Sequence, residues 1–304
     1  MLLPALNEES SITKVIKDLL EYVPACNILV IDNGSTDKTS LIAKELGVDV
    51  TFEPKRGKSY AVRRGFSLVP PNITTVFLLD SDDTYDVSPI VQAVKLVIDN
   101  NIDMVVGCRK SNIDKSRKPA FKKSHYYGNL AFTKLSNLLS PTGIEDVLSG
   151  WRVMSIPFVR SFTGSSNGFE IESELNGHAF LIKSAILNLD IEYRGRKNNS
   201  DSKLKTYSDG FKILRVKFKL FSDYRPKLAF TLFSIPWVLA STLFIGRSVN
   251  GYLETGLVSQ FPSLIVGTAS FIIAVLLIIS GVILQKITLF RSVVIQLAYK
   301  QAVK

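Results

Sequence analysis

Two carboxylates, Asp80 and Asp82, stand two residues apart directly after a short apolar run that begins at Val76. If the chain turns at this point, both carboxylates can converge on one ligand. Hard divalent cations prefer oxygen ligands, and Mg²⁺ often combines one or two carboxylates with substrate phosphates and water. The pair therefore indicates a metal-diphosphate site, and the alternative is an acidic surface turn.

Three further polar clusters precede this pair, and each follows an expected strand or opens an expected helix. They are Pro4-Ala5-Leu6-Asn7-Glu8, Asp32-Asn33-Gly34-Ser35-Thr36-Asp37 and Arg56-Gly57-Lys58. Taken alone, the second cluster could simply be a turn that caps the next helix. Together, and in this order, the clusters predict one ligand site.

Alternating strand and helix signals must position these clusters. The expected strands are Ile28–Asp32, Val76–Asp80 and Met104–Cys108. The expected amphipathic helices are Ser10–Tyr22, Asp37–Leu46, Lys58–Leu68 and Pro89–Asn100. This alternation predicts an α/β domain with a mainly parallel sheet covered by helices on both faces. Ligands of such sheets bind at the carboxyl ends of the strands, where the polar clusters fall.

The C-terminal third differs in kind. Residues 228–246 contain no charged side chain, and neither do residues 255–285. A helix needs roughly 20 apolar residues to cross a bilayer, so the pattern predicts two membrane-spanning helices rather than two buried core helices. We expect a domain at 1–207, an amphipathic interfacial helix at 208–226 and a two-helix membrane hairpin with a tail at 227–304.

The charges next to the spans predict their orientation. Of the net charge of +10, residues 201–304 carry +9, and their basic residues flank the two apolar stretches rather than the short loop between them. The positive-inside rule then places the N-terminal domain and both termini in the cytoplasm. Basic residues beside apolar runs are typical of membrane anchoring, so we expect no nucleic acid partner. The spans also offer a surface for self-association, although their glycines form no clear small-residue face.

A second basic stretch lies inside the N-terminal domain. Residues 109–123 contain seven basic side chains and one acid. Such a stretch suits a phosphate dianion, and the alternative is a solvated charged loop. Within this stretch the candidate ligands for the anion are Arg109, Lys122 and Lys123, and outside it they are Arg152 and Lys203.

The motifs resemble those of the family-2 glycosyltransferases of the GT-A fold, and among them the polyprenyl-phosphate glycosyltransferases such as dolichol-phosphate mannose or glucose synthases. The matching segments are Pro4–Glu8, Ile31–Asp37, Gly57-Lys58 with Arg64-Gly65, Asp80–Tyr85, Gly128-Asn129, Asp146–Arg152, Glu170–Glu172, Ser202–Leu204 and Asp209-Gly210. The resemblance extends over nearly the whole chain, including the C-terminal spans. It implies a Rossmann-like GT-A domain.

The resemblance also implies roles for single residues. The nucleotide-sugar site would comprise Pro4, Ala5, Asn7, Glu8, Asp32, Gly57, Lys58, Asp80, Ser81 and Asp82. Asp80 and Asp82 would hold the diphosphate through Mg²⁺ or Mn²⁺. The segment Asp146–Arg152 would lie beside the sugar and the acceptor, which makes Asp82, Asp146 and Arg152 the expected catalytic residues.

The expected reaction is the inverting transfer of a hexose from a nucleotide-diphosphate sugar to a polyprenyl phosphate, undecaprenyl or dolichyl, at the cytoplasmic membrane face. A phosphate with a second pKa near 6 is mostly dianionic at pH 7 and needs no base. We therefore expect Asp146 to orient Arg152 or a sugar hydroxyl. The alternatives are transfer to a hydroxyl acceptor on a lipid or polysaccharide, which would need Asp146 as a base, and a catalytically inactive membrane scaffold.

Overall fold

The computed structural model describes residues 1–110, 133, 142–164, 171–194, 221–222, 225–257 and 260–303. The chain forms two compact units, one of Met1–Lys205 with Val294–Lys304 and one of Thr206–Val293. Most of the expected amphipathic helix at 208–226 lies outside the described residues. The same is true of three expected phosphate ligands, Lys122, Lys123 and Lys203.

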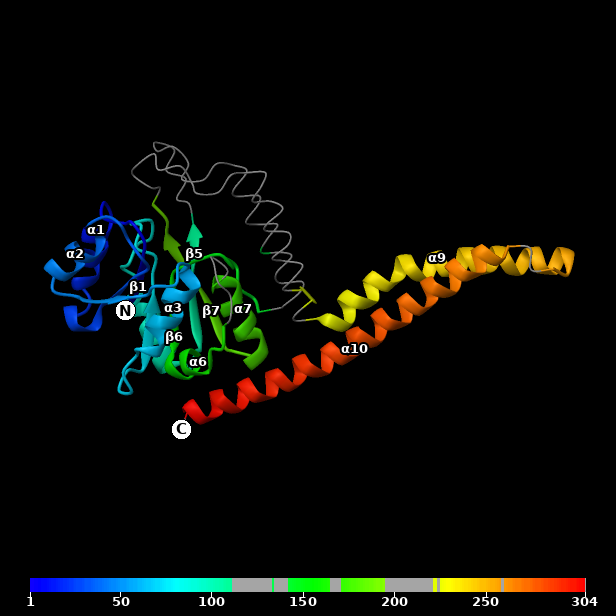
Figure 1. The fold of residues 1–304 in the computed structure, drawn as a ribbon. Coiled ribbons are helices and arrows are strands. Elements are labelled where there is room, and N and C mark those ends of the chain that lie inside the picture. The colour runs from blue at the N-terminus through cyan, green and yellow to red at the C-terminus, as the bar shows by residue number, and fades with distance from the viewer. Residues whose placement is uncertain are drawn as a thin grey trace. The chain divides into compact units, whose positions relative to one another are not determined.

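The described part of the first unit is built on a seven-stranded sheet in the order β3-β2-β1-β4-β6-β5-β7 (Figure 1). The strands are β1 (Leu2–Ala5), β2 (Leu29–Asp32), β3 (Asp49–Phe52), β4 (Thr75–Leu78), β5 (Met104–Lys110), β6 (Arg152–Ser155) and β7 (Ile186–Glu192). Strand β6 pairs antiparallel with β4 and β5, whereas the other pairs are parallel. The mainly parallel sheet that the sequence predicts is confirmed.

Helices cover both faces of this sheet. They are α1 (Ile12–Leu20), α2 (Thr39–Glu45), α3 (Lys58–Ser67), α4 (Ile90–Asp99), α6 (Ile156–Ser161) and α7 (Ile171–Ile182), with a 3-10 turn η1 at Ala25–Asn27. One core cluster contains buried side chains of α1, α2 and α4, and the other contains those of α3, α6 and α7. The four helices expected from the sequence are present, and each is shorter than expected by at most two residues at either end.

Alternation along the strands separates the two cores. Leu3 and Phe77 belong to the cluster under α1, while their neighbours Leu2 and Leu78 belong to the cluster under α3. Successive side chains of a strand point to opposite faces of the sheet, so apolar residues in a row fill both cores. This explains why the central strands appear in the sequence as continuous apolar runs.

The second unit contains two long helices, α9 (Pro226–Thr255) and the larger part of α10 (Phe261–Val303). Both are long and apolar enough to cross a membrane. They pack closely at glycines of α10: a Cβ on Gly267 would lie 2.9 Å from the backbone nitrogen of Ile245, and one on Gly281 would lie 2.8 Å from Cβ of Phe230. These two glycines are 14 residues apart, four turns of helix, and therefore lie on one face.

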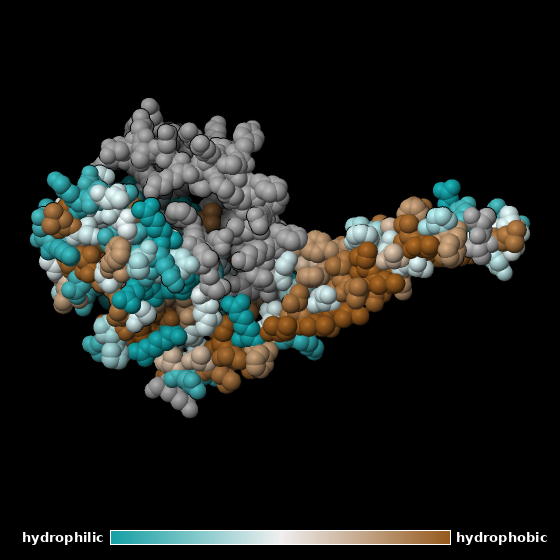
Figure 2. Space-filling view, in the orientation of Figure 1, coloured by the Kyte–Doolittle hydropathy of each residue, from teal (hydrophilic) through white to brown (hydrophobic). Residues whose placement is uncertain are grey.

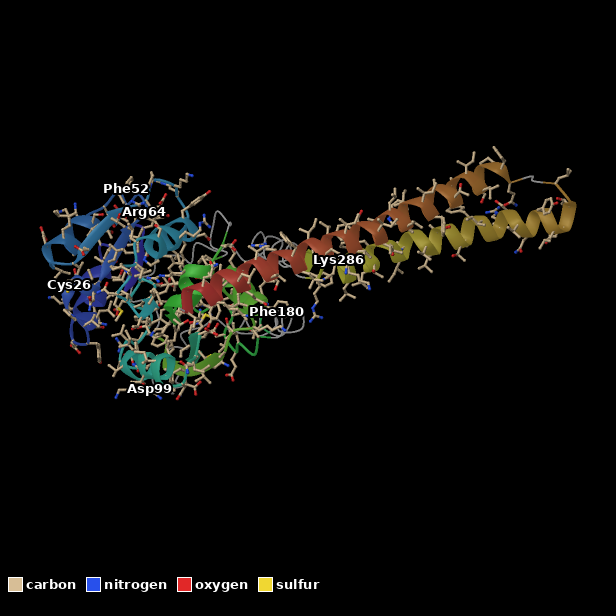
Figure 3. All side chains as sticks on the ribbon, turned by 90° about the horizontal axis from the view of Figure 1, so that it is seen from below. Cys26, Phe52, Arg64, Asp99, Phe180 and Lys286 are labelled. Carbon is tan, nitrogen blue, oxygen red and sulfur yellow. The ribbon has the colours of Figure 1, made fainter. Side chains whose placement is uncertain are left out.

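Exposed apolar side chains distinguish these helices from core helices. In the most apolar 18-residue stretch of each helix, only 17% of α9 and 22% of α10 is buried. Figure 2 shows hydrophobic residues at the surface along both helices. The charge-free stretch of α10 ends at Lys286, which Figure 3 labels. Large apolar surfaces exposed on a helix of this length are typical of contact with lipid.

The end of α10 packs within the first unit instead. Ile295 is buried, Gln296 donates a hydrogen bond to the carbonyl oxygen of Leu181 (2.9 Å), and the hydroxyl of Tyr299 donates one to Asp103 (2.5 Å). Residues 294–304, which the sequence analysis assigns to a tail of the hairpin, thus belong with the sheet domain. Asp103 precedes β5, so this contact lies at the amino edge of the sheet.

Candidate active site

The polar clusters meet at the opposite, carboxyl edge of the sheet. Asn7 and Glu8 follow β1, Asn33 follows β2 and Asp80 follows β4. The segment that ends at Trp151 leads into the antiparallel strand β6, so it reaches the same edge from the other direction. The sheet therefore gathers the expected nucleotide, metal and acceptor segments, as the strand pattern predicts.

Hydrogen bonds join the first two clusters into one wall. The backbone N–H of Asn7 donates to Ser35 (3.0 Å), and that of Glu8 donates to Thr39 (2.8 Å). In return, the side-chain oxygen of Asn7 accepts the backbone N–H of Thr36 (2.8 Å). The first loop is thereby fixed to the second across strands β1 and β2.

Asp32 takes part in the same wall. Its carboxylate accepts the backbone N–H of Ser35 (2.9 Å) and the hydroxyl of Ser40 (2.5 Å). Asp32 therefore stabilises the turn after β2, while the N-cap residue of α2 is Lys38, whose side chain makes no capping hydrogen bond. A role for Asp32 toward a nucleotide stays a proposal.

Asn33, to which the sequence analysis assigns no individual role, connects this wall to the Gly57 turn. Its side-chain nitrogen donates to the carbonyls of Glu53 (3.2 Å) and Lys55 (2.7 Å), and its oxygen accepts the N–H of Gly57 (2.6 Å). Gly57 has φ 135°, a conformation that favours glycine because other residues carry a Cβ. The sequence signals for Asn33 are its place directly after a strand and its position in the matched segment Ile31–Asp37.

The loop after β4 orients its three carboxylates differently. Asp82 accepts hydrogen bonds from the hydroxyl (2.5 Å) and backbone N–H (3.3 Å) of Thr84. Asp83 pairs with Lys14 of α1 (2.6 Å), whereas Asp80 pairs with Lys58. Asp83 is thus tied to a helix, and Asp80 and Asp82 remain the pair expected to hold a metal.

Ser81, Pro4 and Ala5 have structural partners. The Ser81 hydroxyl donates to the carbonyl oxygen of Pro4 (2.8 Å), and the Ser81 carbonyl accepts from Ser11 (2.8 Å). The carbonyl of Ala5 accepts the N–H of Asn33 (2.9 Å). Ser81 is buried. These three residues, which the sequence analysis expects at the nucleotide, connect β1 to the loop after β4 and to the loop after β2.

Gly150 brings the segment before β6 against the loop after β4. A Cβ at this residue would lie 2.6 Å from Cγ and 2.8 Å from Oδ1 of Asp80, closer than real Cβ atoms come. The N–H of Gly150 donates to the hydroxyl of Tyr85 (3.1 Å). Burial raises the pKa of Tyr85, which keeps that hydroxyl protonated at neutral pH. Gly150 therefore leaves room for the Asp80 carboxylate, which any larger residue would displace.

Lys58 stands between two acids. It begins α3, and its ammonium contacts Asp80 and lies 2.5 Å from the carboxylate of Glu172 on α7. Burial alone would lower the pKa of Lys58, but the charges of Asp80 and Glu172 outweigh this effect and raise it. Glu172 lies within a matched motif, yet the sequence does not reveal that Glu172 and Asp80 both pair with Lys58.

Asp146 is paired with Arg109 rather than with Arg152. The guanidinium of Arg109 donates through Nε (2.6 Å) and Nη2 (2.8 Å) to the two carboxylate oxygens, and its backbone N–H donates at 3.3 Å. Arg109 also lies over the ring of Tyr193, 5.5 Å from its centroid. Burial would lower the pKa of Arg109, but its hydrogen bonds to Asp146 raise it.

The structure removes Arg152 from the expected catalytic and phosphate-binding residues. Its side chain is 0% exposed, and its guanidinium donates to the carbonyls of Ser149 (3.0 Å) and Val147 (3.3 Å) and to Asn176 (2.7 Å). Burial lowers its pKa. Its hydrogen bonds stabilise the conformation of the segment before β6. Sequence reasoning erred because a motif arginine next to a substrate loop can face either the ligand or the core.

The donor set around Asp80 fits a hard cation. No group of three or more His, Cys, Asp or Glu side chains within the described ranges could hold a metal by itself. Asp80 and Asp82 offer carboxylate oxygens, and the backbone of Gly150 leaves space at the Asp80 carboxylate. Mg²⁺ and Mn²⁺ are commonly held by one or two carboxylates together with substrate phosphates and water, so the residues present suit such an ion.

The chain is similar in sequence to a known protein family and to several curated proteins. A family model described as glycosyl transferase family 2 matches residues 1–161. Protein RfbJ of Shigella flexneri is 40% identical over 125 residues, which is 41% of this chain and 93% of that protein. A dolichyl-phosphate hexose transferase of Haloferax volcanii is 26% identical over 227 residues, 73% of this chain and 93% of that protein.

A solved structure shares the fold. Glucosyl-3-phosphoglycerate synthase from Mycobacterium tuberculosis, in complex with Mn²⁺ and UDP-glucose, superposes with a TM-score of 0.53 and 22% sequence identity. The superposition covers 73% of this chain and 77% of that chain. It confirms the GT-A architecture that the sequence motifs imply.

Proposed function

Because the chain belongs to glycosyl transferase family 2, it is a glycosyltransferase, and we propose that it transfers a hexose from a nucleotide-diphosphate sugar to a polyprenyl phosphate at a membrane surface. The transfer inverts the anomeric configuration and depends on a divalent metal. The donor site comprises the loops after β1, β2 and β4, and the acceptor lies beside the segment that ends at Trp151.

Asp80 and Asp82 would hold Mg²⁺ or Mn²⁺ together with the donor diphosphate. When bound, such an ion neutralises the negative charge that builds on the departing diphosphate. The Mn²⁺ and UDP-glucose bound by the synthase of M. tuberculosis support this assignment. Lys58 adds a cation beside Asp80, and the wall of Asn7, Glu8 and Asp32 would hold the nucleoside.

The choice of acceptor rests on the Arg109–Asp146 pair. A hydroxyl acceptor must lose a proton, and Asp146 is the carboxylate that the sequence offers as its base. Both oxygens of Asp146 accept charge-assisted hydrogen bonds from Arg109, and the side chains of Asp146 and Arg109 are only 6% and 13% exposed. If Asp146 took a proton, this bidentate pair would be disrupted. A phosphate dianion removes the need for any base.

With such an acceptor the reaction balances without proton transfer. An oxygen of the acceptor phosphate forms a bond to the anomeric carbon of the hexose, while the bond from that carbon to the donor diphosphate breaks. The nucleoside diphosphate leaves with the electron pair. In this chain Asp146 holds Arg109 in place, and Arg109 with the basic residues Lys122, Lys123 and Lys203 is proposed to attract the phosphate.

The membrane helices supply the reason for a lipid acceptor. Both are apolar enough to span a bilayer, and the relative from H. volcanii is named as acting with dolichyl phosphate. Residues 294–304 pack with the catalytic unit, so a chain whose two spans both cross the membrane has its catalytic unit and its end on one side. The basic residues that flank the two helices support a cytoplasmic position for that side.

Transfer assays test the proposal. The full chain, purified in detergent, is incubated with Mn²⁺, polyprenyl phosphate and radiolabelled UDP-glucose, GDP-mannose or UDP-N-acetylglucosamine. We expect at least one donor to yield labelled lipid, and EDTA to abolish the product. Absence of lipid-extractable label with every donor would contradict the proposal.

A further inference from the structure

The ammonium of Lys58 contacts Oδ1 of Asp80, one of the two oxygens that this carboxylate could offer to a metal. Its side chain is 16% exposed and contacts Asp80 directly, while Glu172 accepts from the same nitrogen at 2.5 Å. The side chains of Asp80 and Glu172 are 26% and 9% exposed, respectively. One cation thus neutralises two acids that are largely shielded from water.

The Asp80 carboxylate has little freedom to avoid Lys58. Gly150 lies against it so closely that a Cβ there would sit 2.6 Å from Cγ of Asp80. Charges in a partly buried site stay paired, because leaving one unpaired costs several kcal/mol. A metal that approaches Asp80 must therefore displace Lys58 or share the carboxylate with it, and either requires work against an existing ion pair.

Building on the proposed function, we propose that Lys58 is an internal counter-ion of Asp80 that competes with the metal and suppresses metal binding until a nucleotide diphosphate arrives. The diphosphate carries the negative charge that lets Lys58 leave Asp80. Metal and nucleotide then bind with positive coupling, and by thermodynamic reciprocity each raises the affinity for the other.

Two variants, one double and one single, should shift this competition in opposite directions. Lys58→Gln/Glu172→Gln removes the counter-ion and its second acid together, so the net charge is unchanged and Glu172 is not left as an unpaired buried carboxylate. Glu172→Gln alone leaves the whole charge of Lys58 to Asp80. The double variant should bind metal more tightly than the wild type in the absence of nucleotide, and the single variant more weakly.

The measurement is a titration of the full chain in detergent with Mn²⁺, following free Mn²⁺ by electron paramagnetic resonance, without nucleotide and with UDP or GDP. Site couplings are commonly about 5- to 150-fold. We expect nucleotide to tighten Mn²⁺ binding to the wild type within that range, and the double variant to bind Mn²⁺ alone at least about 5-fold more tightly than the wild type.

Lys55→Gln is the matched control. Lys55 is exposed, lies three residues before Lys58 and places its ammonium 5.7 Å from the centroid of the Tyr60 ring, so its loss removes a nearby charge without touching Asp80. Its Mn²⁺ affinity should match that of the wild type. Thermal unfolding of each variant shows that it is folded.

A folded double variant that binds Mn²⁺ alone no more tightly than the wild type would overturn the inference. That result is independent of the acceptor, because no transfer is measured. If polyprenyl phosphate is glycosylated but the double variant shows no gain in Mn²⁺ affinity, only the role of Lys58 is wrong. If the gain is seen but no lipid product forms, the acceptor assignment fails instead.

Discussion

Carboxylates that look equivalent in the sequence have different partners in the fold. Asp83 is held by Lys14, Asp146 by Arg109 and Asp80 by Lys58, whereas Asp82 accepts from its own neighbour Thr84. The hydrogen bonds from Thr84 fix the orientation of the Asp82 carboxylate, which we propose as a ligand of the metal.

Asp82→Asn should lower kcat at least about 100-fold, the scale expected when one group that stabilises developing charge is lost. The amide retains an oxygen that can accept from Thr84, so the thermal unfolding midpoint should stay close to that of the wild type. The measurements are kcat and metal-dependent nucleotide binding. Asp83→Asn is the control, since it changes the neighbouring carboxylate but affects only the pair with Lys14. Equal losses in both variants would refute the assignment.

Asp146→Asn separates an orienting residue from a general base. On our account the acidic limb of kcat/KM belongs to the acceptor phosphate: as pH falls through about 6, the dianion gains a proton and becomes a weaker nucleophile. The variant should therefore have a lower kcat/KM, because Arg109 loses its partner, but keep the limb near pH 6. Loss of that limb in the variant would identify Asp146 as the base.

At this scale the sequence predicts residue types better than partners. The spacing of Asp80 and Asp82 after an apolar run indicates their shared loop, and the structure confirms where that loop lies. The partner of Asp146 is Arg109 on β5, which is 37 residues away in the chain. Arg152 is only six residues from Asp146, yet its guanidinium faces buried carbonyls. Side-chain direction depends on packing that no local motif encodes.

Among the elements, the segment before β6 and the loop after β4 are matched to one another through Gly150. Gly150→Ala should displace the Asp80 carboxylate and weaken metal-dependent nucleotide binding at least about 10-fold, because the new Cβ would overlap the Asp80 carboxyl group and force that side chain out of its present position. Isothermal titration with nucleotide and Mn²⁺ measures the effect. Gly246→Ala, where a Cβ meets nothing within 4 Å, should change neither binding nor activity. A fully active Gly150→Ala enzyme would contradict the close approach.

The C-terminal end of α10 forms a second junction between elements. Tyr299→Phe removes the hydrogen bond to Asp103, which also accepts the backbone N–H of Ala185 (2.8 Å) ahead of β7. Hydrogen bonds to charged groups contribute about 1.5–3 kcal/mol, so the thermal unfolding midpoint of the catalytic unit should fall by several degrees. Tyr252→Phe, at a side chain that is 52% exposed, is the control. An unchanged midpoint for Tyr299→Phe would show that the contact is not stabilising.

The helices α1 to α4 could be predicted closely from their patterns, but β3, β6, β7, α6 and α7 are not predicted, and neither is this junction. Periodicity identifies α1 because Ile12, Val15, Ile16 and Leu19 form one buried stripe. The end of α10 carries apolar residues on several faces, so its pattern does not distinguish a membrane tail from a segment that packs on a sheet domain. The decisive contacts, from Gln296 and Tyr299, involve residues more than 100 positions earlier.

For the whole molecule, the uneven distribution of charge and hydropathy predicts a catalytic domain joined to a membrane hairpin, and the described residues contain a sheet domain and two helices long and apolar enough to cross a membrane. Helix α10 has 43 residues, about 65 Å at 1.5 Å per residue, roughly twice the thickness of the hydrocarbon core. A spanning α10 must therefore continue beyond the membrane, in agreement with its end belonging to the catalytic unit. A lipid acceptor is consistent with this organisation.

The acceptor comparison tests the central claim most directly. Initial rates are measured for the full chain with one active donor, Mn²⁺ and either polyprenyl phosphate or the polyprenol of the same chain length. We predict that only the phosphate yields glycosylated lipid, and that mass spectrometry finds the acceptor's phosphorus retained between lipid and hexose. Glycosylation of the polyprenol at a comparable rate would contradict the account, because it would require a base that Arg109 is proposed to keep from acting.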